Sequence, residues 1–493
     1  MTSLYWIIIG IYAALLGFIL LYSFTQLNLL IQYLIYKKKN QPKEKTLANH
    51  PFVTVQLPMF NELFVAERII DQVMKFTYPK DKFEVQVLDD STDETKALIA
   101  KKVAHYKRLG FQIEHLHRDN RQGYKAGALA EGVKVAKGEF IAIFDADFLP
   151  KEDFLERTIP YFDDENIGVV QTKWEHINKD YSLLTKLQAF GLDAHFSVEQ
   201  AGRNTAGHFI NFNGTAGVWR KSTIENAGGW QSDTITEDLD LSYRAQLKGW
   251  KFIYLEGLGS PSELPANMPA LKTQQYRWTK GAAECARKNL IKVFRTRGLG
   301  LSTKVHALFH LMNSFLFVCI MVTALLSVPL LYIKQEMIEF KTLFNYGAIF
   351  LLSLLILSAF YYVSTFYNEE NKKGSFFRFW FKFPAFLSMS MGLSLHNAIA
   401  VVEGYAGKKT PFVRTPKFNI QNRNDTWNRT MYISKSINWL TMLEGLLALY
   451  FLFGIITGIR LQDYGLLIYH IMLFWGFGAV YVYSLSHSLK LNK

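Results

Sequence analysis

The stretch Glu139-Phe140-Ile141-Ala142-Ile143-Phe144-Asp145-Ala146-Asp147 places two aspartates directly after a short apolar run. Such a run predicts a buried β-strand, and the two aspartates then lie at or just past its carboxyl end. Because they are two residues apart, their side chains can point the same way and share one hard divalent cation. An Asp-x-Asp at a strand end is also common without a metal, so the wider pattern is needed to choose between these interpretations.

Two similar apolar runs precede this strand, and each is followed by polar residues. Phe52–Leu57 leads to Asn61-Glu62, and Phe83–Leu88 leads to Asp89-Asp90. Since the runs alternate with helical stretches, we predict an α/β sheet domain. Loops at the carboxyl ends of strands form the ligand crevice of open α/β sheets. The polar residues are therefore candidate ligand-binding residues, with ordinary loop or helix-capping roles as the alternative.

Two later motifs extend the pattern. Thr236-Glu237-Asp238 supplies two more carboxylates, although a threonine followed by acids also suits a solvated helix N-terminus. In Gln274-Gln275-Tyr276-Arg277-Trp278 the first, fourth and fifth residues would share one helical face. Each motif alone is weak, but chance seldom assembles all of them in this order in one chain.

Taken together, the motifs resemble those of the processive glycosyltransferases of family 2, the cellulose, chitin and hyaluronan synthases. Within that group the chain is most similar to the cellulose synthase-like A and C (glucomannan and glucan synthase) groups. Four phrases within residues 50–420 carry the similarity: Gln56–Glu62, Val87–Asp93, Gly123–Leu129 and Phe412–Lys417. The resemblance implies a GT-A-type nucleotide-sugar domain. It also implies an inverting transfer of a hexose from a UDP- or GDP-sugar to a growing β-linked glycan, which the protein would translocate.

The resemblance also implies a role for each candidate residue. Asp238 is expected to deprotonate the acceptor hydroxyl, with Glu237 orienting the acceptor. Asp147, together with Asp145, is expected to hold Mg²⁺ or Mn²⁺, because hard oxygen ligands and a diphosphate suit these ions. The residues expected to bind substrate are Asn61, Glu62, Asp89, Asp90, Lys125, Asp145, Gly214, Thr215, Gln274, Arg277, Trp278, Arg414 and Lys417.

Three of these expectations concern distinct parts of the substrates. Lys125 lies in a glycine-rich turn where a cation can approach phosphate, or it is simply a solvated lysine. Trp278 offers an aromatic face to the acceptor sugar, or it belongs to an interfacial aromatic belt. Phe412–Lys417 resembles the gating loop of cellulose synthases, but Arg414 and Pro416 depart from the cellulose version.

Composition and charge indicate a membrane enzyme. Hydrophobic residues make up 49% of the chain, and 55 basic residues exceed 42 acidic ones to give a net charge of +13. No basic-aromatic nucleic-acid module accompanies this charge, so anionic headgroups and nucleotide sugars are the expected partners and nucleic acid is not. The two cysteines, Cys285 and Cys319, are far apart and without metal-ligand partners, so they imply neither a disulfide framework nor a zinc site.

Several apolar stretches are long enough to cross a bilayer. Leu4–Tyr36, followed by Lys37-Lys38-Lys39, predicts a retained helix with its basic end in the cytoplasm. Further predicted spans are His306–Tyr332, Leu343–Phe366, Ile437–Phe453 with an extension to Ile459, and Tyr464–Tyr483.

The stretch Ser375–Tyr405 is ambiguous because it is apolar yet contains charged residues and a proline. A full crossing would place Lys408-Lys409 outside, against the positive-inside bias, so we expect an interfacial or channel-lining helix and five spans rather than six. The N-terminus would then lie outside, and Lys490 and Lys493 inside. The Asn-x-Thr sites at Asn213, Asn424 and Asn428 would be cytoplasmic and unglycosylated.

The expected organisation is an N-terminal membrane helix in residues 1–40, a cytoplasmic glycosyltransferase domain in 50–300, and a membrane channel region in 301–493. The expected location is the plasma (inner) membrane. Two alternatives remain: a non-processive transferase that adds one sugar to a lipid carrier, and a non-enzymatic transporter or scaffold. Retention of every candidate catalytic side chain disfavours the last.

Overall fold

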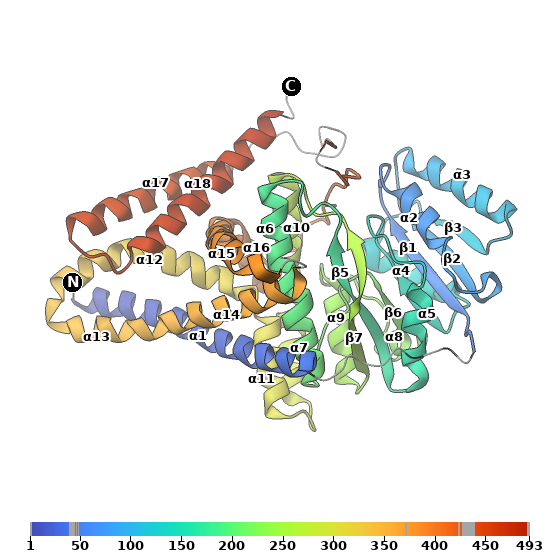
Figure 1. Cartoon of the computed structure of the whole chain (residues 1–493), viewed down its shortest axis with the longest axis horizontal. Helices are drawn as coiled ribbons and strands as arrows, with labels where there is room; N and C mark the ends of the chain where they lie inside the picture. Colours follow the sequence, from blue (N-terminus) through green and yellow to red (C-terminus); the bar gives the residue numbers. More distant parts are fainter. Residues whose placement is uncertain are drawn as a thin grey trace.

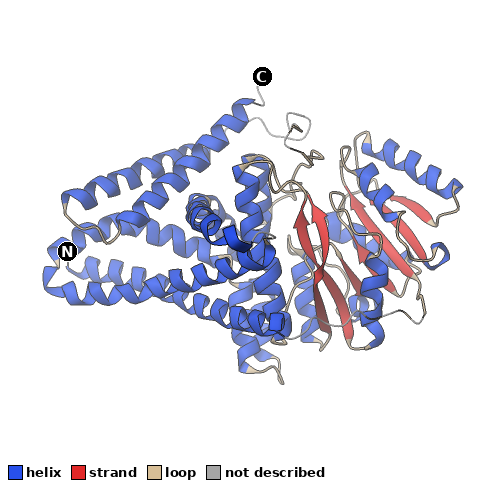
Figure 2. Cartoon of the chain, viewed as in Figure 1, coloured by secondary structure: helices blue, strands red, loops and turns tan. Residues whose placement is uncertain are grey.

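The protein consists of a mixed α/β domain and a bundle of long apolar helices (Figures 1 and 2). The computed structural model describes residues 2–38, 45, 47, 49–369, 372–422, 424–425 and 439–490. Lys39, Asn428, Ile437 and Lys493, which carried expectations above, lie outside this described part of the chain.

A seven-stranded sheet forms the centre of the α/β domain, in the order β3-β2-β1-β4-β6-β5-β7. β6 runs antiparallel to its neighbours β4 and β5, whereas every other neighbouring pair is parallel. The strands are β1 (Val53–Met59), β2 (Phe83–Asp89), β3 (Ile113–His117), β4 (Phe140–Ile143), β5 (Ile167–His176), β6 (Gly217–Arg220) and β7 (Lys251–Ser262). The three strands predicted from the apolar runs are confirmed as β1, β2 and β4.

Helices cover both faces of the sheet and bury two apolar cores against it. Local sequence sets several of their boundaries. Ser182 begins α6 with a capping box to Thr185, and Asn267 begins α10 by accepting the Ala270 N–H at 2.9 Å. The helices are α2 (Ala66–Val73), α3 (Thr95–Arg108), α4 (Tyr124–Val135), α5 (Phe154–Thr158), α6 (Leu183–Ala194), α7 (Gln200–Thr205), α8 (Lys221–Asn226), α9 (Glu237–Leu247) and α10 (Met268–Arg295), with a π-helical turn, η3 (His195–Glu199), between α6 and α7.

The strand directions gather the candidate residues at one edge of the sheet. β1, β2 and β4 are parallel neighbours, so the segments after Met59, Asp89 and Ile143 emerge together. Because β6 is antiparallel to β4, the segment before Gly217 reaches the same edge. Residues that are far apart in the sequence therefore face one crevice.

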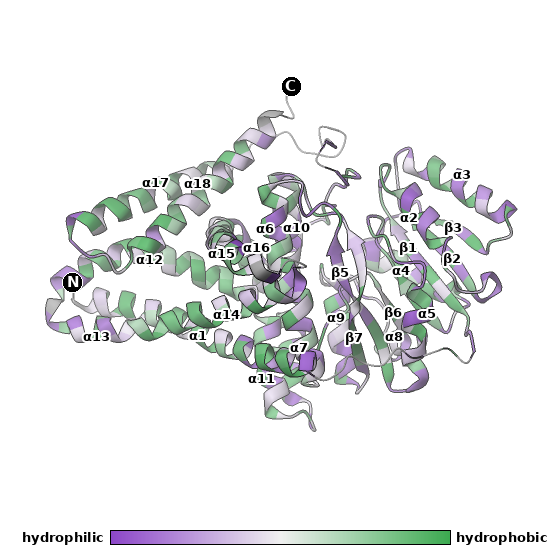
Figure 3. Ribbon diagram, in the orientation of Figure 1, coloured by the Kyte–Doolittle hydropathy of each residue, from purple (hydrophilic) through white to green (hydrophobic). Residues whose placement is uncertain are grey.

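The remaining helices are apolar over most of their length (Figure 3). Among the described residues, five helices are long and apolar enough to cross a membrane, or six if one bent pair counts as a span. The predicted span His306–Tyr332 is wrong at its start, because His306 belongs to the separate helix α11. The bundle contains α1 (Thr2–Lys38), α11 (Leu301–Leu311), α12 (Phe315–Glu336), α13 (Lys341–Tyr346), α14 (Leu351–Asn368), α15 (Ser375–Gly392), α16 (Ser394–Ala406), α17 (Trp439–Arg460) and α18 (Leu467–Lys490).

The bent pair is formed by α15 and α16, which meet at 52° and correspond to the stretch that the sequence left ambiguous. Both ends of the pair contact the α/β domain. Just before it, Asn368 hydrogen-bonds to Lys173 of β5, and just after it Arg414 pairs with Glu62 after β1. A segment that starts and finishes at the same domain returns to its side of origin, so the contacts favour five spans.

Candidate active site

A single pocket lies at the carboxyl edge of the parallel strands and reaches to α10 and the segment after α16. The structure brings thirteen of the predicted site residues to its wall: Glu62, Asp90, Lys125, Asp145, Asp147, Gly214, Glu237, Asp238, Gln274, Arg277, Trp278, Arg414 and Lys417. Their separation in sequence shows that the fold, rather than any one motif, assembles this constellation.

The centre of the pocket pairs each aspartate of the Asp-x-Asp motif with a lysine. Lys125, in the first turn of α4, places Nζ 2.5 Å from Asp145 Oδ1 and 2.8 Å from the Gly214 carbonyl. Lys417 Nζ lies 2.7 Å from Asp147 Oδ2. Burial alone would lower the pKa of Lys125, but the pKa is raised because Asp145 and neighbouring carboxylates favour the ammonium form. Each carboxylate of the motif is therefore matched by an ammonium group at the centre of the pocket.

Two carboxylates at the start of α9 form the next wall. Thr236 makes no side-chain cap, so the capping role weighed for it from the sequence is not what the structure shows. Asp238 reaches Gly214, where a β-carbon would stand 2.9 Å from Asp238 Oδ2 at a φ of +79°. Only glycine suits such a position, because an L side chain is strained there and would press on the carboxylate.

Electrostatics distinguish Asp238 from an ordinary surface aspartate. Burial and the adjacent negative charge of Glu237 raise the pKa of Asp238 to about 7. Burial raises the pKa of Glu237 as well. A carboxylate with a pKa near neutrality can accept a proton from a hydroxyl and retain it, which is what a general base requires.

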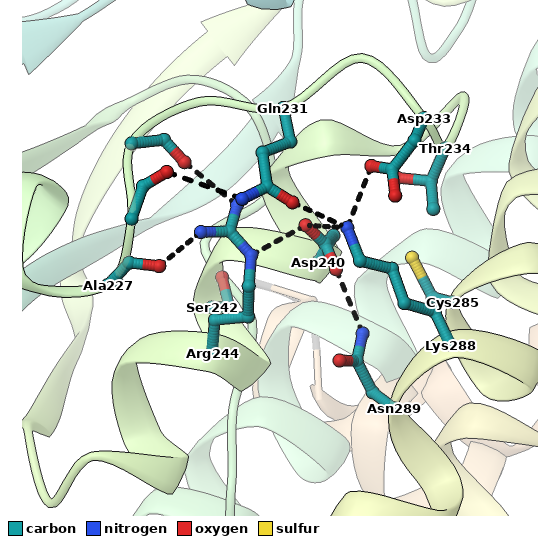
Figure 4. Close-up of polar contacts among 12 residues, drawn as sticks. Ala227, Gln231, Asp233, Thr234, Asp240, Ser242, Arg244, Cys285, Lys288 and Asn289 are labelled. Carbon is teal, nitrogen blue, oxygen red and sulfur yellow. Dashed lines mark hydrogen bonds and ion pairs between the residues drawn. The ribbon is translucent and has the colours of Figure 1, made fainter.

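A network behind α9 fixes the direction of this helix relative to α10 (Figure 4). Asp240 is fully buried and accepts hydrogen bonds from Arg244 Nε at 2.8 Å, Lys288 Nζ at 3.0 Å and Asn289 Nδ2 at 2.9 Å. Lys288 and Asn289 lie on α10, the helix that also carries Arg277. The network therefore joins the helix of the candidate base to the helix of the Gln-x-x-Arg-Trp motif.

The segment Phe412–Lys417 closes one side of the pocket. Arg414 forms a two-pronged contact with Glu62, at 2.8 Å and 2.6 Å, and also reaches the Asn61 carbonyl. Thr415 Oγ1 accepts a hydrogen bond from Arg277 at 2.8 Å. The Phe412 ring lies beneath the Arg277 guanidinium, 4.6 Å from its centroid, in a cation–π contact. This segment is thus docked onto the groups that surround the pocket.

Three predicted site residues do not line the pocket. The Asn61 side chain bonds the Thr92 N–H instead, at 2.9 Å. Thr215 is buried, and its Oγ1 accepts the Asp145 N–H at 2.8 Å. Asp89 lies behind the pocket wall against His115 and His117. These three residues instead support the wall of the pocket.

Other pocket residues were not selected from the sequence. Arg121 stacks over Phe60 with its guanidinium 3.3 Å from the ring centroid. In the sequence it comes three residues after Arg118, which forms an ion pair with Asp90. Glu263 accepts the backbone N–H groups of Phe418 and Asn419, each at 2.9 Å. Arg121 could have been predicted as a pocket residue from the sequence, because it adjoins the glycine-rich turn. Nothing in the sequence predicts the position of Glu263 in the pocket, because its partners lie more than 150 residues away.

Comparison with known proteins shows what this domain is similar to. Residues 50–281 match the family model described as "Glycosyltransferase like family 2". The probable glucomannan 4-beta-mannosyltransferase 4 of Oryza sativa subsp. japonica is 40% identical over 332 residues, which cover 63% of this chain and 60% of the relative. The glucomannan 4-beta-mannosyltransferase 2 of Arabidopsis thaliana is 44% identical over 276 residues, 55% of this chain and 51% of the relative. The chain thus spans between half and two thirds of the length of these relatives.

A solved structure shares the fold. The mannosyltransferase of Pyrobaculum calidifontis, determined in complex with GDP-mannose and Mn²⁺, superposes with a TM-score of 0.55 at 20% identity, covering 82% of this chain and all of that one. The predicted α/β domain of GT-A type is confirmed, with long apolar helices beside it.

Proposed function

We propose that this family 2 glycosyltransferase domain transfers a mannosyl residue from GDP-mannose to the end of a β-linked mannan or glucomannan, with inversion at the anomeric carbon. The geometry that carries the proposal is the convergence of Asp238, Lys125, Asp145 and Arg277 on one pocket. The choice of sugar is supported by the names of the relatives at 40–44% identity. UDP-glucose is the alternative donor.

The pocket divides into three zones that match the parts of such a reaction. We place the nucleoside near Asp90, Glu62 and Arg414, the diphosphate near Asp145 and Asp147, and the acceptor sugar near Trp278. Arg277 and the two lysines supply positive charge for a diphosphate, and a planar guanidinium suits bidentate contact with phosphate oxygens. Trp278 stands 6.5 Å from Trp174, centroid to centroid, so two aromatic faces line the acceptor zone.

The reaction is a single displacement. Asp238 takes the proton of the acceptor hydroxyl as that oxygen bonds to the anomeric carbon, and the bond from this carbon to the diphosphate breaks on the opposite face. Glu237 orients the acceptor. The lysines and Arg277 hold the departing negative charge in the buried pocket, where electrostatic stabilisation is larger than in water.

The Asp145 and Asp147 carboxylates fit Mg²⁺ or Mn²⁺, because both offer hard oxygen atoms to the pocket and already attract a cationic group each. A bound divalent ion would neutralise charge on the diphosphate.

We further propose that the domain faces the cytoplasm. Lys37 and Lys38 lie at the end of α1 nearest the domain, as the positive-inside rule requires, and residues 301–493 form the membrane region through which the product leaves.

A donor panel tests the function. Full-length protein in detergent is incubated with GDP-mannose, UDP-glucose or UDP-N-acetylglucosamine, a divalent ion and a manno-oligosaccharide acceptor, and the nucleoside diphosphate and glycan products are measured. We expect turnover with GDP-mannose and a product degraded by β-mannanase. Turnover with UDP-glucose alone would show that UDP-glucose is the donor. Release of a single-sugar lipid adduct would show that the protein is a non-processive transferase and not a polymerase. The proposal is refuted if none of the donors gives turnover that the substitution Asp238→Asn abolishes.

A further inference from the structure

A second cluster of metal-ligand residues lies outside the pocket, between the ends of β2 and β3. Asp89 ends β2, and His115 and His117 stand two residues apart on β3, so their side chains leave the strand on the same face. His115 Nε2 is 2.9 Å and His117 Nδ1 is 3.1 Å from the same oxygen, Asp89 Oδ2. One ligand atom from each residue lies within 4.8 Å of the others.

These separations match a tetrahedral zinc site. With Zn–N and Zn–O bonds of about 2.0–2.1 Å, tetrahedral ligand atoms stand about 3.3 Å apart. The two histidine nitrogens stand a few tenths of an ångström closer to Asp89 Oδ2 than this spacing, and they lie within 4.8 Å of each other. Two histidines and one carboxylate leave the fourth position for water, and both rings are partly exposed, at 15% and 18% of their side-chain area.

The surroundings supply outer contacts to His117 and to Asp89 of the kind that such sites use. A histidine that binds a metal usually donates its other ring N–H to a carboxylate or carbonyl. His117 Nε2 lies 3.3 Å from Asp119 Oδ1. The second oxygen of Asp89 accepts the Ser91 N–H at 2.9 Å, which fixes the carboxylate in place.

Charge gives an independent reason to expect a cation. Asp89 has no exposed side-chain area, and within the described residues its ion-pair partners are the two histidines, with no lysine or arginine. The nearby Arg118 pairs with Asp90 instead, at 2.6 Å. A buried carboxylate needs hydrogen bonds or an opposite charge: the Ser91 N–H, His115 and His117 contact Asp89 as hydrogen-bonding partners, and a divalent ion would supply the opposite charge.

We propose that Asp89, His115 and His117 bind Zn²⁺ at a structural site distinct from the Asp145/Asp147 pocket. Imidazole nitrogens favour zinc, whereas the all-oxygen pocket favours Mg²⁺ or Mn²⁺, so the two sites select different ions. The site is coupled to the donor side of the pocket by one chain of contacts. Asp89 holds the Ser91 N–H, and Ser91 Oγ accepts the Asn61 N–H at 2.8 Å. Zinc would therefore fix the loop after β1.

The test measures metal binding by the full-length protein, first stripped with a chelator. Co²⁺ serves as the optical probe for the tetrahedral site, Zn²⁺ displaces it, and metal content is measured after desalting. We expect one tightly held zinc per chain. His115→Gln and His117→Gln should weaken zinc binding more than about 100-fold, and Asp119→Asn about tenfold, since loss of an outer partner typically costs 10–100-fold. His105→Gln, an exposed histidine on α3, is the matched control and should bind as wild type.

Two results would overturn the proposal. One is wild-type zinc content no greater than that of the His115→Gln/His117→Gln double variant, which would leave only a hydrogen-bonded cluster. The other is zinc lost in Asp147→Ala but kept in both histidine variants, which would assign the ion to the pocket. X-ray absorption of the zinc-loaded wild-type protein identifies the zinc ligands even if the variants misfold. Two histidine nitrogens at about 2.0–2.1 Å support the site, and an all-oxygen shell refutes it.

Discussion

Ionisation of Asp238 provides the most direct measure of the proposed chemistry. Its pKa is raised to about 7 by burial and by Glu237. A base works only when deprotonated, so a raised pKa removes activity on the acid side. At a pKa of about 7, about one tenth of Asp238 is ionised at pH 6 and about nine tenths at pH 8. We therefore expect kcat/KM to fall about tenfold between pH 8 and pH 6. An aspartate with its ordinary pKa would give a flat profile there.

Two substitutions locate this pH dependence. Asp238→Asn should lower turnover by roughly two to four orders of magnitude, leave nucleotide affinity nearly unchanged and flatten the residual profile. Glu237→Gln removes the adjacent negative charge, so its acid limb should move to lower pH, whatever happens to its rate. Asp233→Asn is the matched control, because Asp233 precedes the same helix but its side chain is 57% exposed.

The measurement is initial release of nucleoside diphosphate at subsaturating donor over pH 5.5–9, with nucleotide affinity determined separately by calorimetry. A wild-type profile that is flat across this range would contradict the raised pKa. An unchanged acid limb in Asp238→Asn would show that another group titrates, and full activity of that variant would remove Asp238 from the mechanism.

Three further perturbations probe the pocket and its support. Asp147→Ala should weaken donor binding, and excess EDTA should abolish wild-type turnover; undiminished turnover in EDTA would exclude a metal requirement. Asp240→Asn leaves the largely buried Arg244 without its carboxylate partner, whereas Lys288 keeps Asp233, and should destabilise the protein by about 3–5 kcal/mol in denaturant unfolding, against less than about 1 kcal/mol for the exposed Asp233→Asn. Trp278→Ala should shorten the glycan more than it weakens donor binding, because an aromatic face can hold a sugar between additions; product lengths equal to wild type, sized by mass spectrometry, would argue against it.

The strands and the site were predictable from the sequence to different degrees. β4 was found because a fully buried strand is a continuous apolar run, and β1 and β2 were found because their apolar residues alternate with polar ones over a short segment. That their ends meet follows from parallel pairing. The antiparallel β6 was not foreseen, since four residues, Gly217–Arg220, give no alternating pattern to detect.

Long-range partners could not be predicted. Nothing in Arg414 indicates Glu62, and nothing in Lys417 indicates Asp147, because each pair is more than 250 residues apart and is brought together by tertiary packing. The position of Asp89 is similar: Asp-Asp after a strand predicts polar contacts, but only the register of β3 shows that the first aspartate meets two histidines. Local propensity also failed for His306, because apolar content alone does not reveal the break between α11 and α12.

Membrane topology provides the last prediction. Tyr5 hydrogen-bonds to Glu336 at 2.6 Å and Lys334 pairs with Asp463, which gathers the start of α1, the end of α12 and the α17–α18 turn at the far end of the bundle. Asn368 and Arg414 bracket the bent pair and both contact the α/β domain, so Lys409 should lie on the side of that domain.

Cysteine labelling in intact cells tests this assignment in a background carrying Cys285→Ala and Cys319→Ala. Tyr464→Cys, at a position 60% exposed, should react with an impermeant maleimide from outside, whereas Lys409→Cys and the domain marker Ser232→Cys should react only after permeabilisation. If Lys409→Cys reacts from outside while Ser232→Cys does not, the bent pair crosses the membrane and the segment Phe412–Lys417 cannot close the pocket. If all three react alike, the bundle is not arranged across the membrane as its contacts require.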